Sequence, residues 1–80
     1  MVVQWDERNL RHLLLDNGWR NISPGEVEEV LANPNSERRR LRDGRRRYRG
    51  ATSGGRRLVV VVEVPAQQRL RPLTAWETRS

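Results

Sequence analysis

The sequence predicts an α+β fold, with two N-terminal helices packed on one face of a four-stranded antiparallel sheet. Two observations predict this class. Up to Pro34 the apolar residues follow the spacing of amphipathic helices, and beyond it turn signals divide the chain into short strand-like runs. The 80 residues are enough for one small domain, 1–80, with a limited core.

The first helix is expected to begin after Asp6, a residue suited to the N-cap, with Glu7 in the first turn. Residues 2–5 before it are compatible with a short strand, so the sheet is expected to have four strands, or five if this segment joins it. Asn17-Gly18 is expected to end the helix, because glycine readily adopts the left-handed conformation found there. The apolar face of this helix consists of Leu10, Leu13 and Leu14.

The second helix has the clearest start signal. Ser23 and Glu26 have the spacing of a capping box, in which each side chain bonds the backbone N–H of the other residue. Ile22 and Val27 are placed to form a hydrophobic staple across this start. Pro34 is expected to end the helix, because the residue before a proline disfavours helical backbone. The buried stripe is Val27, Val30 and Leu31.

Three turn signals divide the rest of the chain, at Asp43-Gly44, at residues 53–55 and at residues 65–68. Such short links favour antiparallel neighbours. Residues 58–62 are apolar on both faces, which suits a central strand. The four strands are expected near residues 37–42, 45–52, 56–64 and 69–75.

Charge is distributed unevenly along the chain. All sixteen basic residues are arginine, and the formal net charge is +6. Residues 1–37 hold three arginines and seven acidic residues, whereas residues 38–80 hold thirteen arginines and three acidic residues. This asymmetry indicates a polyanion, an acidic protein, or both as partners.

A two-residue loop at Asp43-Gly44 would place six arginines on one face of a hairpin, because strand residues alternate between faces. These candidate nucleic-acid-binding residues are Arg38, Arg40, Arg42, Arg45, Arg47 and Arg49. Their mutual repulsion would be relieved by an anionic ligand, and the guanidinium group binds phosphate with two hydrogen bonds. The alternative is a solvated edge whose charges only prevent aggregation.

Several classes of site and location are disfavoured. Cysteine is absent and His12 is the only histidine, so neither a disulfide framework nor a metal site is expected, and no cofactor is predicted. The longest apolar run, residues 58–62, is too short to cross a bilayer, and the N-terminus lacks the pattern of a leader peptide. The expected location is the cytoplasm. For His12, both a catalytic and a half-buried structural role remain open.

The order and spacing of several segments, over nearly the whole chain, resemble the BrnT-type toxins of the wider RelE-like group. The segments that carry the resemblance are Trp5-Asp6-Glu7, residues 23–31, Tyr48-Arg49-Gly50-Ala51-Thr52, Gly55-Arg56 and residues 70–75. The resemblance implies helices on a twisted antiparallel sheet. It also implies a small metal-independent ribonuclease, in which the RNA 2′-hydroxyl attacks the adjacent phosphate, and a cognate antitoxin that binds it.

The resemblance also suggests site residues. Arg71 matches the family's arginine on the last strand and Arg56 the one after the glycine turn; with the neighbouring Arg49 they are the catalytic candidates. Two positions depart from the family. Asn17 stands where members usually carry histidine, and Trp76 stands where they carry arginine. Trp76 is expected either to stack on a base or to cover the edge of the core.

Three functions therefore remain open from the sequence. The first is a toxin-like ribonuclease, favoured by Arg71. The second is a degenerate homologue that binds nucleic acid or antitoxin without cutting, favoured by Asn17 and Trp76. The third is a protein-interaction domain whose arginines bind an acidic antitoxin. The expected partners are RNA and an antitoxin, and either a homo-oligomer or a toxin–antitoxin hetero-oligomer is compatible with them.

Overall fold

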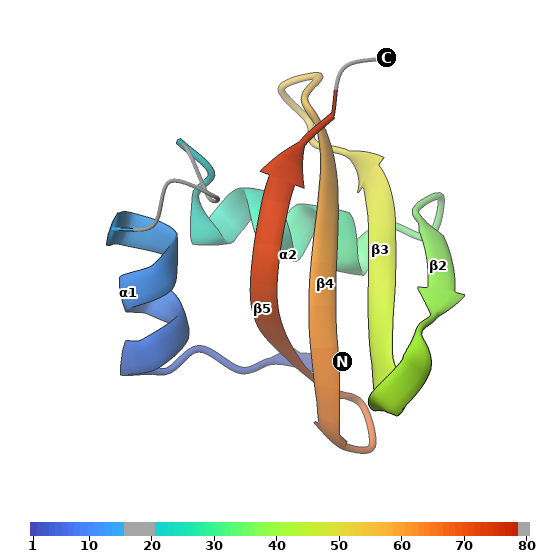
Figure 1. Cartoon of the computed structure of the whole chain (residues 1–80). Helices are drawn as coiled ribbons and strands as arrows, with labels where there is room; N and C mark the ends of the chain where they lie inside the picture. The colour runs from blue at the N-terminus through green and yellow to red at the C-terminus, as the bar shows by residue number, and fades with distance from the viewer. Residues whose placement is uncertain (16–20, 79–80) are drawn as a thin grey trace.

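The computed structural model describes residues 1–15 and 21–78 of the chain. This part contains two helices, five strands and a short 3₁₀ turn at Arg42–Gly44 (Figure 1). The elements in order are β1 (Val2–Val3), α1 (Glu7–Leu15), α2 (Pro24–Ala32), β2 (Glu37–Arg40), β3 (Arg45–Ala51), β4 (Arg57–Ala66) and β5 (Arg69–Glu77). The predicted α+β class and the additional N-terminal strand are confirmed.

The sheet is mixed, so the prediction of a purely antiparallel sheet was wrong. Its strand order is β1-β5-β4-β3-β2. The four later strands pair antiparallel, as their short links require, but β1 runs parallel to β5, with Val2 beside Arg69. A parallel pair needs a long connection. Here the rest of the domain provides it, because β1 is the first strand and β5 the last.

The start of α1 follows the predicted cap. Asp6 Oδ1 accepts a hydrogen bond from the Asn9 backbone N–H at 2.9 Å, and the Asn9 side chain accepts from the Asp6 N–H at 2.8 Å. Asn9 is buried, and its amide also donates to the carbonyls of Gln4 and Pro72. This side chain therefore fixes the first turn of α1 against β5. The side chains of Leu13 and Leu14, and the predicted end at Asn17-Gly18, lie outside the described residues.

The start of α2 confirms the predicted capping box. Ser23 Oγ accepts from the Glu26 N–H at 3.2 Å, and Glu26 Oε1 accepts from the Ser23 N–H at 3.0 Å. Ile22 and Val27, the predicted staple, are both buried in one cluster. The helix ends at Ala32, two residues before Pro34, and the Asn33 N–H bonds the Glu29 carbonyl.

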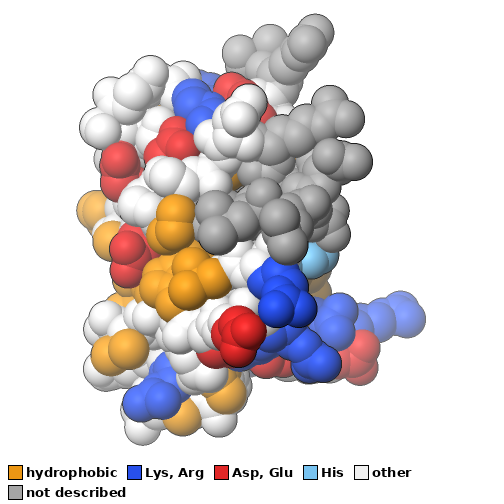
Figure 2. Space-filling model, turned by 90° about the vertical axis from the view of Figure 1, so that its left-hand side faces the viewer, with side chains coloured by type: hydrophobic (Ala, Val, Ile, Leu, Met, Phe, Trp, Pro, Cys, Tyr) orange, Lys and Arg blue, Asp and Glu red, His pale blue; other side chains and the backbone are white. Residues whose placement is uncertain are grey.

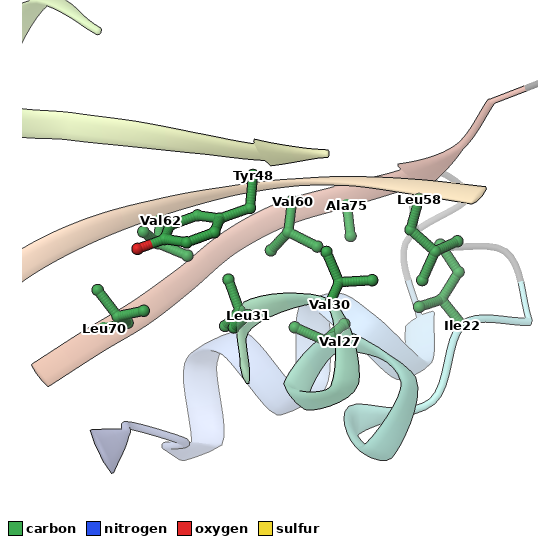
Figure 3. Packing of buried hydrophobic residues seen from close by; sticks show 10 residues of the cluster. All are labelled: Ile22, Val27, Val30, Leu31, Tyr48, Leu58, Val60, Val62, Leu70 and Ala75. Carbon is green, nitrogen blue, oxygen red and sulfur yellow. The ribbon is translucent and has the colours of Figure 1, made fainter. Parts of the chain in front are cut away.

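The core lies between α2 and one face of the sheet (Figure 3). Val27, Val30 and Leu31 of α2, the predicted stripe, are buried there, together with Ile22 just before the helix. The sheet contributes Tyr48, Leu58, Val60, Val62, Leu70 and Ala75. Val59 is also buried, at 5% exposure, but it lies outside this cluster because it points to the opposite face of β4. The helices thus cover only one side of the sheet.

The β2–β3 hairpin has a different register from the predicted one. Arg40 pairs with Arg46 and Arg39 with Arg47, and the Leu41 N–H donates to the Arg45 carbonyl at 2.8 Å. The loop therefore has three residues, Arg42–Gly44, instead of two. Asp43 and Gly44 have φ values of 67° and 73°, a left-handed conformation that aspartate and glycine both tolerate. The same dipeptide that favours a two-residue turn can therefore close a longer one.

This one-residue shift separates the six arginines that were predicted to share a face, so that prediction was wrong. A shift by one residue moves every side chain of a strand to the other face. Arg38 and Arg40 pair with Tyr48 and Arg46 and so lie on the helix-covered side, at its edge. Arg42 lies in the loop. Arg45, Arg47 and Arg49 remain together on the opposite face.

The remaining turns also refine the predictions. The turn at residues 53–55 is confirmed, with Gly55 in the left-handed region at φ 85°. The turn predicted at residues 65–68 is shorter, because β4 extends through Ala66, which pairs with Arg69. β5 likewise continues beyond its predicted end to Glu77.

Gly50 in β3 offers a test of this packing. A Cβ at this position would clash with Ser36 Oγ, which donates to the Val30 carbonyl at 2.7 Å. Gly50→Ala is therefore expected to lower the free energy of unfolding by about 1–3 kcal/mol, measured by urea denaturation. Adding Ser36→Gly should recover part of the loss. Gly54→Ala is the control, because its Cβ would meet Thr52 at an ordinary 3.8 Å. Equal effects of the two glycine substitutions would contradict this account.

Candidate nucleic-acid interface

The face of the sheet opposite α2 is covered by neither described helix, since α2 lies behind the sheet and α1 beside β5 (Figure 1). We call it the open face. Strand register places five arginines of β2, β3 and β4 there, because directly paired residues of neighbouring strands point to the same side, and it places Arg71 of β5, the partner of Glu63, on that side as well. The five are Arg39 of β2, Arg45, Arg47 and Arg49 of β3, and Arg57 of β4. Glu37 and Glu63 are the acidic residues among their paired neighbours.

The middle of the open face is apolar. Val59 and Val61 of β4 point to this side, and their partners on β5 are Trp76 and Thr74. Trp76 is 41% exposed at this surface. Val59 is nearly inaccessible because Arg49 and Trp76 flank it on either side, and long arginine stems can cover apolar neighbours. The arginines thus border an apolar strip that ends in an indole ring.

Two adjoining grooves run along β2 and β3 on this side. One, of about 380 Å³, is lined by Glu37, Arg38, Arg39, Arg47 and Arg49. The other, of about 560 Å³, is lined by Asn33, Asn35, Glu37, Arg49, Gly50, Ala51 and Arg57. They share Glu37 and Arg49, so the two grooves adjoin at these residues, and we call the pair of grooves the channel.

The arginines of this channel are available for a ligand. Within the described residues, the guanidinium groups of Arg39, Arg47, Arg49 and Arg57 make no hydrogen bond to another side chain and no ion pair. Arg56 and Arg71, the two other catalytic candidates, differ from these arginines because both form ion pairs with carboxylates.

Arg71 is held by two carboxylates. Its Nε donates to Asp6 Oδ2 at 2.8 Å, its Nη2 to Asp6 Oδ1 at 3.4 Å, and its Nη1 to Glu63 Oε1 at 3.1 Å. Only 15% of its side chain is exposed. The Arg71 hydrogen bonds hold the pKa of Asp6 below its ordinary value. The group therefore links the start of α1 to β4 and β5, and its donors are already occupied by anions.

Arg56 has a comparable environment. Its Nη1 donates to Glu26 Oε2 at 3.0 Å and to the Asn21 carbonyl at 2.7 Å, and its Nη2 donates to Glu77 Oε1 at 3.0 Å. The Ser23 N–H, and to a smaller extent Arg56, lower the pKa of Glu26. Arg56 therefore connects the start of α2 to the end of β5. Of the three catalytic candidates, only Arg49 lies on the open face with an uncommitted side chain.

The α1 side of the molecule has a different character. A hollow there is lined by Asp6, Glu7, Arg8, Arg11 and Arg71. Figure 2 shows basic and acidic side chains intermixed on this side. His12 is half-buried on α1, and Asn17 lies outside the described residues.

Sequence reasoning missed two members of the site and the partners of two others. Arg39 was not among the six arginines predicted to share a face, because a two-residue loop would place it on the other side of the hairpin, and Arg57 was not considered. The available signal for Arg57 was its position next to Leu58, because neighbouring residues of a strand point to opposite faces and Leu58 is buried in the core. Asp6, Glu26 and Glu77, the carboxylates that bind Arg71 and Arg56, are far from them in sequence, so no local pattern identifies these pairs.

The comparisons give no family for the chain: no family model, no curated protein and no solved structure matches it. Within residues 1–15 and 21–78, no three histidine, aspartate or glutamate side chains gather as metal ligands. In the same part of the chain, neither helix is long and apolar enough to span a membrane.

The Arg71–Asp6 pair predicts a specific acid sensitivity. Because the folded-state pKa of Asp6 is depressed below 3.8, its contribution to stability is full above that value and is lost as the pH falls through the folded-state pKa. Asp6→Asn keeps a side chain able to cap α1 but removes the charge. We therefore expect the variant to be less stable at neutral pH and to lose less stability on acidification, measured by urea denaturation between roughly pH 7 and pH 2.

Glu7→Gln is the matched control, because Glu7 is exposed and its one ion pair among the described residues is with the exposed Arg11. Its stability should follow that of the wild type at each pH. If Asp6→Asn also gave a curve parallel to that of the wild type, the ion pair with Arg71 would not contribute to the folded state.

Proposed function

We propose that this chain binds single-stranded RNA on its open face without cleaving it. The observation that carries the proposal is the set of five arginines beside an apolar strip on a face that no described helix covers. Arginine suits RNA, because its planar group binds phosphate through paired hydrogen bonds and also stacks on bases. Binding to RNA agrees with an action in the cytoplasm.

Charge repulsion supports a ligand for this face. Arg39 lies directly opposite Arg47, and like charges at such positions destabilise a sheet. Arg45 lies opposite Glu63, but that carboxylate already accepts from Arg71. A phosphate backbone along the channel would neutralise several of these groups at once and release bound counterions.

The apolar strip favours single strands over duplexes. Trp76, beside Val59, offers an exposed ring for stacking, and stacking on an aromatic side chain contributes about 1–3 kcal/mol per base. Bases within a duplex are not available for such contacts, whereas those of single strands are.

The engagement of Arg56 and Arg71 favours binding over cleavage. A metal-independent ribonuclease needs cations placed where negative charge develops on the phosphate. Two of the three arginines proposed for that role are bonded to carboxylates of the chain itself. In terms of the BrnT-type resemblance, we propose a homologue that has lost RNA cleavage but retains a nucleic-acid-binding face. An acidic segment of an antitoxin would also fit this face.

Replacing Arg47 and Arg49 together by glutamine should weaken RNA binding and its salt dependence. Each phosphate contact with a single strand contributes about −0.7 to the log–log slope of affinity against salt. We expect the slope for a uridine oligonucleotide of about nine residues to become less steep by roughly 1.4, measured by fluorescence anisotropy.

The matched control removes two arginines from α1, as Arg8→Gln/Arg11→Gln. It changes the net charge equally but leaves the open face intact, so its slope should stay near that of the wild type. Equal losses in both double variants would show a general effect of net charge. Wild-type protein that binds no RNA but captures an acidic peptide would replace this proposal with the protein-interaction function.

Cleavage provides a separate test. Wild-type protein incubated with a mixed RNA pool in EDTA should leave the RNA intact, because its candidate transition-state cations are engaged. Metal-free cleavage that Arg71→Ala abolishes would instead establish the ribonuclease and place Arg71 in its site. The experiment uses gel analysis of end-labelled RNA, with Arg8→Ala as the matched arginine control.

A further inference from the structure

We propose that the groove between the start of β2 and the end of β3 is a base pocket selective for guanine. This inference rests on the proposed RNA binding and adds a sequence preference to it. The groove measures about 560 Å³ and combines a carboxylate, two side-chain amides and two arginines, from Glu37, Asn33, Asn35, Arg49 and Arg57.

The wall that carries Glu37 is held in place by the fold. The Asn35 N–H donates to Asn33 Oδ1 at 2.9 Å, and the Ser36 N–H donates to the Asn33 carbonyl at 3.0 Å. Ser36 Oγ in turn bonds the Val30 carbonyl of α2, and it packs closely on Gly50. The segment between α2 and β2 is therefore fixed before a ligand arrives, which lowers the entropic cost of selective binding.

Glu37 is an unusual residue for this surface. It is exposed, it lies directly opposite Arg49, and within the described residues its carboxylate accepts no hydrogen bond and forms no ion pair within 4.0 Å. A negative charge here opposes phosphate binding by the surrounding arginines. Its presence is explained if the carboxylate binds the part of a nucleotide that donates hydrogen bonds, namely the base.

Guanine is the base that fits a carboxylate best. An ionised carboxylate has two oxygens and only accepts hydrogen bonds. The Watson–Crick edge of guanine presents two adjacent donors, N1–H and the N2 amino group, which can bond both oxygens at once. Adenine, cytosine and uracil each offer a single donor group beside an acceptor on that edge, and the acceptor would face the carboxylate oxygen.

The neighbouring arginines suit the rest of such a nucleotide. Arg57 and Arg49 line the same groove and can bind the phosphate of the inserted nucleotide, while Arg39 and Arg47 line the adjoining groove. The pocket is thus positioned at one end of the proposed phosphate path, where a single base can leave the strand and enter it. Single-stranded RNA permits this because its bases can be splayed out.

The test uses four RNAs of about nine nucleotides that differ only in the central base of a uridine strand: guanine, hypoxanthine, adenine or uracil. Hypoxanthine keeps N1–H but lacks the N2 amino group. By fluorescence anisotropy we expect wild-type protein to bind the guanine strand roughly tenfold more tightly than the adenine strand, with hypoxanthine between them. Glu37→Gln should remove this preference while keeping or increasing affinity for the all-uridine strand.

Glu28→Gln is the matched control, because Glu28 is an exposed glutamate on α2 that lines neither groove. It should retain the guanine preference. Equal affinity of wild-type protein for the guanine and adenine strands, or a preference that survives in Glu37→Gln, would overturn the guanine pocket and leave RNA binding intact. Absence of salt-sensitive binding to any of the strands would instead overturn the proposed function itself.

Discussion

The one-sided burial of the sheet is the constraint from which the rest of the molecule follows. In a chain of this size, α2 supplies the main apolar cover, through Val27, Val30 and Leu31, and it reaches only one face of β3 and β4. The central strand β4 is nevertheless apolar on both sides, so Val59 and Val61 need cover from elsewhere. Long side chains on β3 and β5 provide it for Val59, and this is why arginines and a tryptophan surround a valine strip.

The positions of the carboxylates then divide the arginines into two kinds. Arg71 binds Asp6, at the start of α1, and Glu63 of β4. Arg56 binds Glu26, in the first turn of α2, and Glu77 at the end of β5. These pairs connect elements far apart in sequence and are part of the architecture. The arginines on β2 and β3 have no such partners among the described residues. Because like charges on a bare cationic surface repel one another, these are the arginines that an anionic ligand would stabilise.

Much of the fold could be predicted because its signals are local. The capping box at Ser23 and Glu26 fixes the start of α2 with bonds between neighbours, and the continuous apolar run at residues 58–62 identifies β4. The parallel β1–β5 pair and the Arg71–Asp6 ion pair could not be predicted, because they join residues more than sixty positions apart. The candidate site was predicted only in part. Alternation within one strand shows which residues share a side of that strand. It shows which residues of two strands share a face of the sheet only when the register between the strands is known.

Loop length is therefore the feature that decides the character of the site. With a two-residue loop, Arg38 would face Arg49, and Glu37 would lie opposite Gly50 on the helix-covered side. The observed three-residue loop, Arg42–Gly44, places Glu37 opposite Arg49 and Arg39 opposite Arg47. It thereby reduces the number of arginines that the hairpin contributes to the open face, but it places the Glu37 carboxylate beside them. In the RNA-binding function that we propose, this carboxylate is the group that would let the surface distinguish between bases.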